Sequence, residues 1–269
     1  MQTRDTDWDW NEIAKCEPYW GVLTGPEYKL ANLTPATLEQ FYQAGENDVR
    51  SIFDQVSNLA PSFRPRCALD FGCGVGRLLI PIARRSEKAY GLDIADRMLE
   101  ICAERLRTEK INNVTLVKSD DTLSGAPTQF DFLTSFIVFQ HIPPRRGYML
   151  LRGLLNRLAP SGIFYIQLTF AKSGQHLPYI ATPVDLFRED ESLLAILTEL
   201  PHSERTGQMH MHDYDLNVVF AHLSRVGIEK MFVSFTDHGG CHGVQLCGRK
   251  AALAAGQTAT AATPASPET

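Results

Sequence analysis

A glycine-rich turn and a later acid are the residues of this chain whose spacing most clearly indicates chemistry. The turn lies in LDFGCGVGR at residues 69–77, and Asp93 ends the next apolar run. A strand, a glycine-rich turn, a helix and a second strand that closes on an acid are typical of the first half of a nucleotide-binding βαβ unit. Together they predict a nucleotide-like ligand at this turn.

The spacing of the glycines separates this turn from a dinucleotide site. Gly72, Gly74 and Gly76 are spaced G-x-G-x-G, whereas the dinucleotide fingerprint is G-x-G-x-x-G and opens a helix under a pyrophosphate. Asp70 precedes the turn, and a carboxylate there suits an ammonium or hydroxyl group better than an anion. The sequence therefore predicts a ligand other than NAD.

Five motifs in order resemble those of the class I S-adenosylmethionine-dependent methyltransferases of the small-molecule type. After LDFGCGVGR come GLDIADRML at 91–99, VKSDD at 117–121, FDFLTSFIVFQHIP at 130–143 and LNRLAPSGIFYI at 155–166. One glycine-rich turn alone is a weak signal, but five motifs in the right order are specific. The resemblance implies S-adenosyl-L-methionine as the cofactor.

The resemblance also assigns donor-binding residues. It implies that the turn lies beside the methionine portion and that Asp93 takes both ribose hydroxyls. Asp120 would meet the adenine amine, but Ser119 stands where the family often has glycine, which leaves the choice between Asp120 and Asp121 open. The expected cofactor contacts are Asp70, Gly72, Cys73, Gly74, Gly76, Asp93, Ile94, Met98, Asp120 and Phe136.

Histidines supply the candidate proton acceptors. His141 follows the fourth expected strand, where relatives border the methyl group, although a capping or packing role fits its place equally well. His210, His212 and His238 belong to segments expected at the carboxyl edge of the sheet, where ligands bind. We expect His141, His212 and His238 as catalytic candidates and His210 as a substrate contact, with solvent-facing or capping loop histidines as the alternative.

A metal site is the less favoured interpretation of these histidines. Asp213 and Asp237 stand beside H-x-H and H-x-x-x-H pairs, but such free-standing pairs in loops are weak metal signals. We expect no metal.

The N-terminal segment is unusually aromatic. Its rings could shelter a cation or stack on a ring-shaped substrate. We expect Tyr19 and Trp20 to contact the substrate, and the sequence leaves open whether Trp8 and Trp10 do so or pack a helix on the core.

These residues must be positioned by a sheet, and periodicity predicts its elements. Apolar runs flanked by amphipathic helices predict the fold class α/β with a mostly parallel sheet. The resemblance implies that this is a Rossmann-like doubly wound sheet of seven strands with an antiparallel last strand. Strands are expected at 67–71, 89–93, 114–118, 130–137, 163–168, 230–235 and 244–249, and helices at 35–59, 77–84, 95–108, 145–158 and 214–226. The short connection between the last two strands predicts a hairpin.

We expect a methyltransferase domain at 35–250 that contains one insert and is flanked by a segment at either end. Residues 1–34 form an aromatic lid, residues 169–212 form a lid or substrate insert with a helical patch near 186–200, and residues 251–269 form a disordered tail.

The composition of the chain indicates which partners and which cellular compartment to expect. A formal charge of -5 with scattered basic residues leaves no stripe for a phosphate backbone, so nucleic acid is not an expected partner. No apolar run is long enough to span a membrane, and six scattered cysteines fit a reduced, cytoplasmic protein. The oligomeric state does not follow from the sequence.

The expected activity is methyl transfer to a small molecule. Several histidines at the carboxyl edge, and the lack of N-P-P-Y or D-P-P-Y after the fourth strand, favour a hydroxyl acceptor. The alternatives are N-methylation of a small amine, and a regulatory protein that binds S-adenosylmethionine without turnover.

Overall fold

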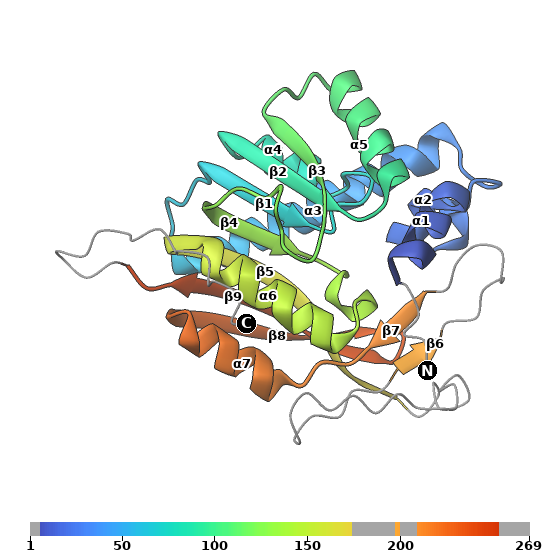
Figure 1. The fold of residues 1–269 in the computed structure, drawn as a ribbon. Helices are drawn as coiled ribbons and strands as arrows, with labels where there is room; N and C mark the ends of the chain where they lie inside the picture. The colour runs from blue at the N-terminus through green and yellow to red at the C-terminus, as the bar shows by residue number, and fades with distance from the viewer. Residues whose placement is uncertain (1–5, 174–196, 200–208, 253–269) are drawn as a thin grey trace, which may run out of the picture.

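A seven-stranded sheet forms the centre of the structure (Figure 1). The computed structural model describes residues 6–173, 197–199 and 209–252. The strands of the sheet are β1 (Cys67–Phe71), β2 (Lys88–Asp93), β3 (Val114–Lys118), β4 (Phe130–Ser135), β5 (Leu158–Lys172), β8 (Ile228–His238) and β9 (Cys241–Lys250).

The strand order is β3-β2-β1-β4-β5-β9-β8. The first five strands pair in parallel, and β9 runs antiparallel to both of its neighbours, β5 and β8. This confirms the predicted Rossmann-like sheet with a reversed last strand. A separate two-stranded ribbon is made of β6 (Leu197–Glu199) and β7 (His210–His212).

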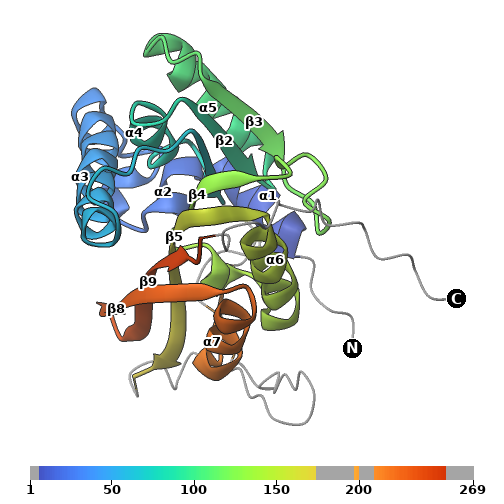
Figure 2. The same ribbon diagram turned by 90° about the vertical axis from the view of Figure 1, so that its left-hand side faces the viewer.

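Helices cover both faces of the sheet (Figure 2). They are α1 (Thr6–Cys16), α2 (Pro18–Val22), η1 (Pro26–Tyr28), α3 (Pro35–Leu59), α4 (Leu79–Ala83), α5 (Asp96–Thr108), η2 (Phe139–His141), α6 (Pro144–Arg157) and α7 (Leu216–Arg225). One apolar core lies under α3, α4 and α5, and the other lies under α6 and α7. Alternate residues of β1 supply the two cores, because successive strand side chains point to opposite faces: Ala68 belongs to the first and Leu69 to the second.

The turn after β1 depends on glycine. Gly72, Gly74 and Gly76 all have positive φ angles, of 75°, 53° and 89°, a region that glycine adopts without steric cost. A Cβ atom on Gly72 would lie 2.4 Å from a methyl carbon of Val138. The backbone of the turn therefore lies directly against the segment that follows β4.

The structure corrects several expected boundaries. Residues 197–199 form β6 and not part of a helical patch, while the rest of that patch lies outside the described residues, as does the tail from 253 onward. β5 is much longer than expected because it pairs with β9 as far as Lys172. Among the described helices, none has both the length and the apolar character needed to cross a membrane.

Candidate active site

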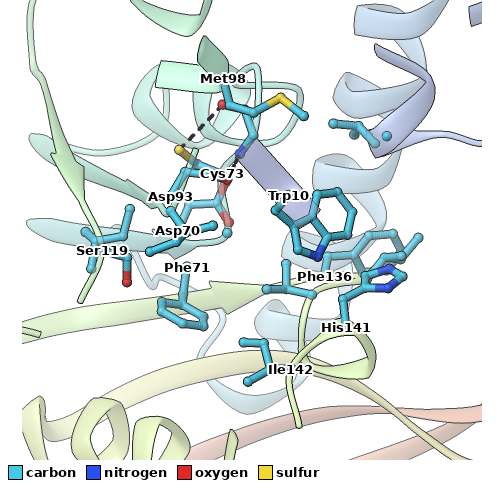
Figure 3. Close-up of a pocket in the computed structure, with 18 of the residues that line it drawn as sticks. Trp10, Asp70, Phe71, Cys73, Asp93, Met98, Ser119, Phe136, His141 and Ile142 are labelled. Atoms are coloured by element: carbon cyan, nitrogen blue, oxygen red, sulfur yellow. Dashed lines mark hydrogen bonds between the residues drawn. The ribbon is translucent and has the colours of Figure 1, made fainter. Parts of the chain in front are cut away.

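A pocket lies at the carboxyl ends of β1, β2, β3 and β4 (Figure 3). All of the expected donor contacts except Gly76 line it. Gly76 instead packs against the side chains of Cys102 and Ile80, since a Cβ atom there would lie 2.6 Å from the Cys102 sulfur. Its part in the site is thus to shape the turn, and the donor contacts of the others stay predictions.

The Asp93 carboxylate, at the end of β2, is held by two backbone N–H groups, one from the glycine turn and one from the residues that follow Asp93. Its Oδ2 accepts a hydrogen bond from the Gly74 N–H at 2.8 Å, and its Oδ1 accepts one from the Ala95 N–H at 2.9 Å. Burial raises the pKa of Asp93, and these backbone donors oppose the rise. Each oxygen retains a lone pair, so the carboxylate can accept from two neighbouring hydroxyl groups, as a ribose presents them.

Asp70 is buried at the end of β1. Burial raises its pKa to about 7, while the Thr134 hydroxyl, which donates to its Oδ1 at 2.8 Å, and the nearby Arg77 oppose the rise. The carboxyl group is therefore close to half ionised at neutral pH before any ligand binds. A cationic ligand would favour its ionised form.

This raised pKa predicts a pH-dependent donor affinity. If the ammonium of S-adenosylmethionine meets the ionised carboxylate, as the sequence predicts, the affinity should rise with pH up to about 7 and then level off. Below that value it should fall by up to about tenfold per pH unit. Calorimetry over a pH series measures this, and Asp70→Asn should bind weakly with no such dependence. A flat profile for the wild type would show that Asp70 does not meet the donor cation.

Asp120 also lines the pocket, but its carboxylate already binds its own turn. It accepts hydrogen bonds from the Ser124 hydroxyl and from both the backbone N–H and the hydroxyl of Thr122, and these bonds lower its pKa. The neighbouring Asp121 points instead to Arg146, with Oδ1 2.6 Å from Nε. Asp120 is therefore the better placed of the two for the predicted adenine contact.

His141 lies in η2 on the pocket wall, beside Trp10 (Figure 3). Its Nδ1 is 2.8 Å from the His210 carbonyl oxygen, which can only accept, so Nδ1 carries the hydrogen and Nε2 keeps its lone pair. The Gln140 amide lies 3.3 Å from Nε2. Burial lowers the pKa of His141 to about 4 against the effect of the His210 carbonyl, so the ring is neutral at physiological pH and its Nε2 is a hydrogen-bond acceptor.

The other candidate histidines do not line this pocket. His212 is buried, its backbone carbonyl accepts from the Thr169 hydroxyl at 2.6 Å, and burial lowers its pKa to about 3. His238 lies 2.7 Å from the Gln167 amide nitrogen. His210 is buried behind His141, with its Nε2 3.7 Å from an Asp9 oxygen. Their catalytic and substrate roles stay predictions.

The N-terminal aromatic residues expected to contact the substrate do not line this pocket, and that role stays a prediction for them. Tyr19 packs its ring edge-on against Phe41, Trp20 lies under Lys29, and neither lines the pocket. Trp10 does, with its ring centre 4.9 Å from that of His141. The available signal was helical spacing, because Thr6, Trp10 and Ile13 share one face of α1. Among the described residues, no three or more histidine, cysteine or acidic side chains gather as a metal site.

Comparison with known proteins agrees with this geometry. Residues 68–162 match a family model described as a methyltransferase domain. The chain is 29% identical over 126 residues to the 23S rRNA (uracil(1939)-C(5))-methyltransferase of Alkalilimnicola ehrlichii, which covers 47% of this chain and 28% of that protein. It is 28% identical over 152 residues to the ubiquinone biosynthesis O-methyltransferase of Methylocella silvestris, which covers 54% of this chain and 57% of that protein.

The chain thus spans less than two thirds of each of these curated relatives. Among solved structures, magnesium protoporphyrin IX methyltransferase from Synechocystis PCC 6803 with bound SAM aligns with a TM-score of 0.56 at 14% identity, over 93% of this chain and 100% of that one. The sheet order, the glycine turn that meets Asp93 and the family match at residues 68–162 show that the chain contains a class I S-adenosylmethionine-dependent methyltransferase domain.

Proposed function

We propose that this protein transfers the methyl group of S-adenosylmethionine to a hydroxyl group of a small molecule. The observation that carries the proposal is His141, a neutral imidazole on the wall of the donor pocket whose tautomer is fixed by the His210 carbonyl. A hydroxyl acceptor must lose a proton during the transfer, and the neutral imidazole can take it at Nε2 in place of the hydrogen of the Gln140 amide, whose nitrogen lies 3.3 Å from that atom.

The residues of the pocket fit the donor. Asp93 suits the ribose, Asp70 suits the ammonium, and the bare backbone at Gly72 and Gly74 admits the methionine portion closely. When bound, S-adenosylmethionine supplies an electrophilic methyl group on a sulfonium. His141 would accept the proton that the acceptor hydroxyl loses as its oxygen becomes methylated, so the protein would contribute mainly positioning and proton removal.

Two features favour a small acceptor. Near His141 the described lining is apolar or aromatic, with Trp10, Phe136 and Ile142, which suits an organic ring better than a charged backbone. The formal charge of -5 offers no attraction to nucleic acid. Several relatives are named for ribosomal or transfer RNA, but each aligns with less than half of this chain. The relatives named for ubiquinone biosynthesis align with 54 to 61% of it.

N-methylation of a small amine is the competing assignment. The aromatic faces of Trp10 and Phe136 could shelter an ammonium group, and a neutral amine needs no base to attack. A regulatory protein that binds the donor without turnover would have the same donor pocket.

A labelled-donor screen separates these functions. The protein is incubated with methyl-labelled S-adenosylmethionine and two matched acceptor sets, one of phenols and alcohols and one of amines with the same carbon skeletons. We expect label and S-adenosylhomocysteine to appear together with hydroxyl acceptors. Label in the amines alone would establish N-methylation, and donor binding with no product from either set would support the regulatory function.

A further inference from the structure

The N-terminal helix α1 forms one wall of the donor pocket. Thr6, Asp7 and Trp10 line the cavity from this helix, while Ile13 on the same face is buried. In Figure 1, α1 and α2 lie together at the end of the sheet where the β6–β7 ribbon also lies. A donor in the pocket would therefore be enclosed between α1 and the carboxyl ends of the strands.

Arg146, near the start of α6, connects this wall to the rest of the pocket. Its Nη1 and Nη2 bind the two carboxylate oxygens of Asp7, the second at 2.9 Å, and Nη1 also lies 3.4 Å from the Thr6 hydroxyl. Its Nε donates to Asp121 at 2.6 Å. One guanidinium thus joins α1, α6 and the segment after β3, with the two-pronged geometry that makes arginine–carboxylate pairs strong.

The charges of this group are unequal. Two carboxylates bind this one guanidinium, so its removal would leave Asp7 and Asp121 close together without the positive charge that Arg146 supplies. The Arg146 side chain is 24% exposed and that of Asp7 is 35% exposed, so salt in the solvent can screen the attraction. The position of α1 therefore depends on Arg146 more than on either acid.

The acceptor end of the pocket depends on the same helix. Trp10 lies one turn after Asp7, and its ring meets the edge of the His141 ring. We propose that Arg146 is a positioning residue which, by binding Asp7 and Asp121, holds α1 closed over the donor and sets Trp10 against His141. This inference rests on the proposed function, because it treats the pocket as the donor site.

The test measures the dissociation rate of S-adenosylhomocysteine by stopped-flow displacement. Asp7→Asn should raise the rate about fivefold, the scale of one partly exposed ion pair. Arg146→Met retains the apolar stem but leaves two facing acids, so it should raise the rate roughly tenfold or more. The double variant Asp7→Asn/Arg146→Met no longer has two neighbouring acids that repel each other. Its dissociation rate should therefore fall back towards that of Asp7→Asn.

Controls separate an electrostatic role from a general loss of packing. Arg145→Met removes an exposed arginine from the same helical turn and should leave the rate unchanged. Added salt should speed dissociation from the wild type and slow it from Arg146→Met, where it screens repulsion. Turnover at saturating donor should fall with Arg146→Met, since Trp10 is no longer held.

The outcomes are distinct from failure of the proposed function. If the wild type binds no donor, the donor site itself is wrong. If it binds donor but Arg146→Met leaves the rate unchanged, or if the double variant dissociates faster than Arg146→Met, the positioning role of Arg146 is wrong. Should Arg146→Met not fold, as judged by its melting temperature, the Asp7→Asn rate and its weaker salt dependence decide the same question.

Discussion

Asp93→Ala is expected to reduce the affinity for S-adenosylmethionine by about 2 to 4 kcal/mol, or roughly 30- to 900-fold. The carboxylate offers two acceptors for the ribose hydroxyls. It also fixes the Gly74 and Ala95 backbone through hydrogen bonds of 2.8 and 2.9 Å. Its loss therefore removes ligand contacts and loosens the turn that lies beside the methionine portion. Calorimetry with the donor measures the change.

Asp96→Ala is the matched control for this change. Asp96 begins α5 close to Asp93, but it is exposed, and its carboxylate pairs with Lys118 at 2.6 Å. The Asp96→Ala substitution removes the same charge as Asp93→Ala at a residue that does not line the pocket. It should therefore leave the donor affinity close to that of the wild type. Equal affinity of Asp93→Ala and the wild type would remove the ribose assignment.

His141→Asn is expected to lower turnover with a hydroxyl acceptor by about 10²- to 10⁴-fold, the range for loss of a general base. Asparagine can still donate to the His210 carbonyl, so the local packing should survive while the Nε2 acceptor is lost. Donor affinity should change little, because Asp70 and Asp93 remain. The measurement is kcat at saturating donor, and a wild-type kcat in this variant would exclude His141 as the proton acceptor.

The pH dependence of the same reaction provides an independent check. Because burial lowers the pKa of His141 to about 4, the imidazole is in its basic form throughout the neutral range. At saturating donor, kcat should therefore hold from neutral pH down to about 5 and fall only as the pH approaches 4. A limb near neutral pH would instead indicate a group with an ordinary histidine pKa.

His212 and His238 can be compared in the same assay. They contact Thr169 and Gln167 on β5 and not the described pocket lining. If they nevertheless touch the acceptor, alanine at either position lowers turnover strongly while donor binding is kept. Wild-type turnover in both would leave His141 as the proton acceptor.

The strands of the sheet could be predicted because short stretches of the sequence indicate them. Apolar runs such as 67–71 and 130–137 have the length of buried parallel strands, and the glycine turn with Asp93 links two of them by a short helix. The doubly wound arrangement of the strands is instead what the family resemblance implies. The extent of β5 could not be predicted, because its last residues are ordered by pairing with β9, far along the chain.

Much of the site depends on contacts that could not be predicted from the types of the residues involved. His141 is oriented by a backbone carbonyl of His210, and any residue at that position could supply one. Arg146 and Asp7 are 139 residues apart, and nothing local marks either as a partner. Helical spacing puts Trp10 on one face of α1 with Thr6 and Ile13, but spacing alone does not say that this face covers the pocket.

A crystal structure with bound S-adenosylmethionine is the most direct test of the central claim. We expect both ribose hydroxyls within hydrogen-bond distance of Asp93, the methionine portion along Gly72 to Gly74, and the sulfonium methyl directed towards the space between His141, Phe136 and Trp10. A donor bound elsewhere, or one whose methyl points away from His141, would contradict the account.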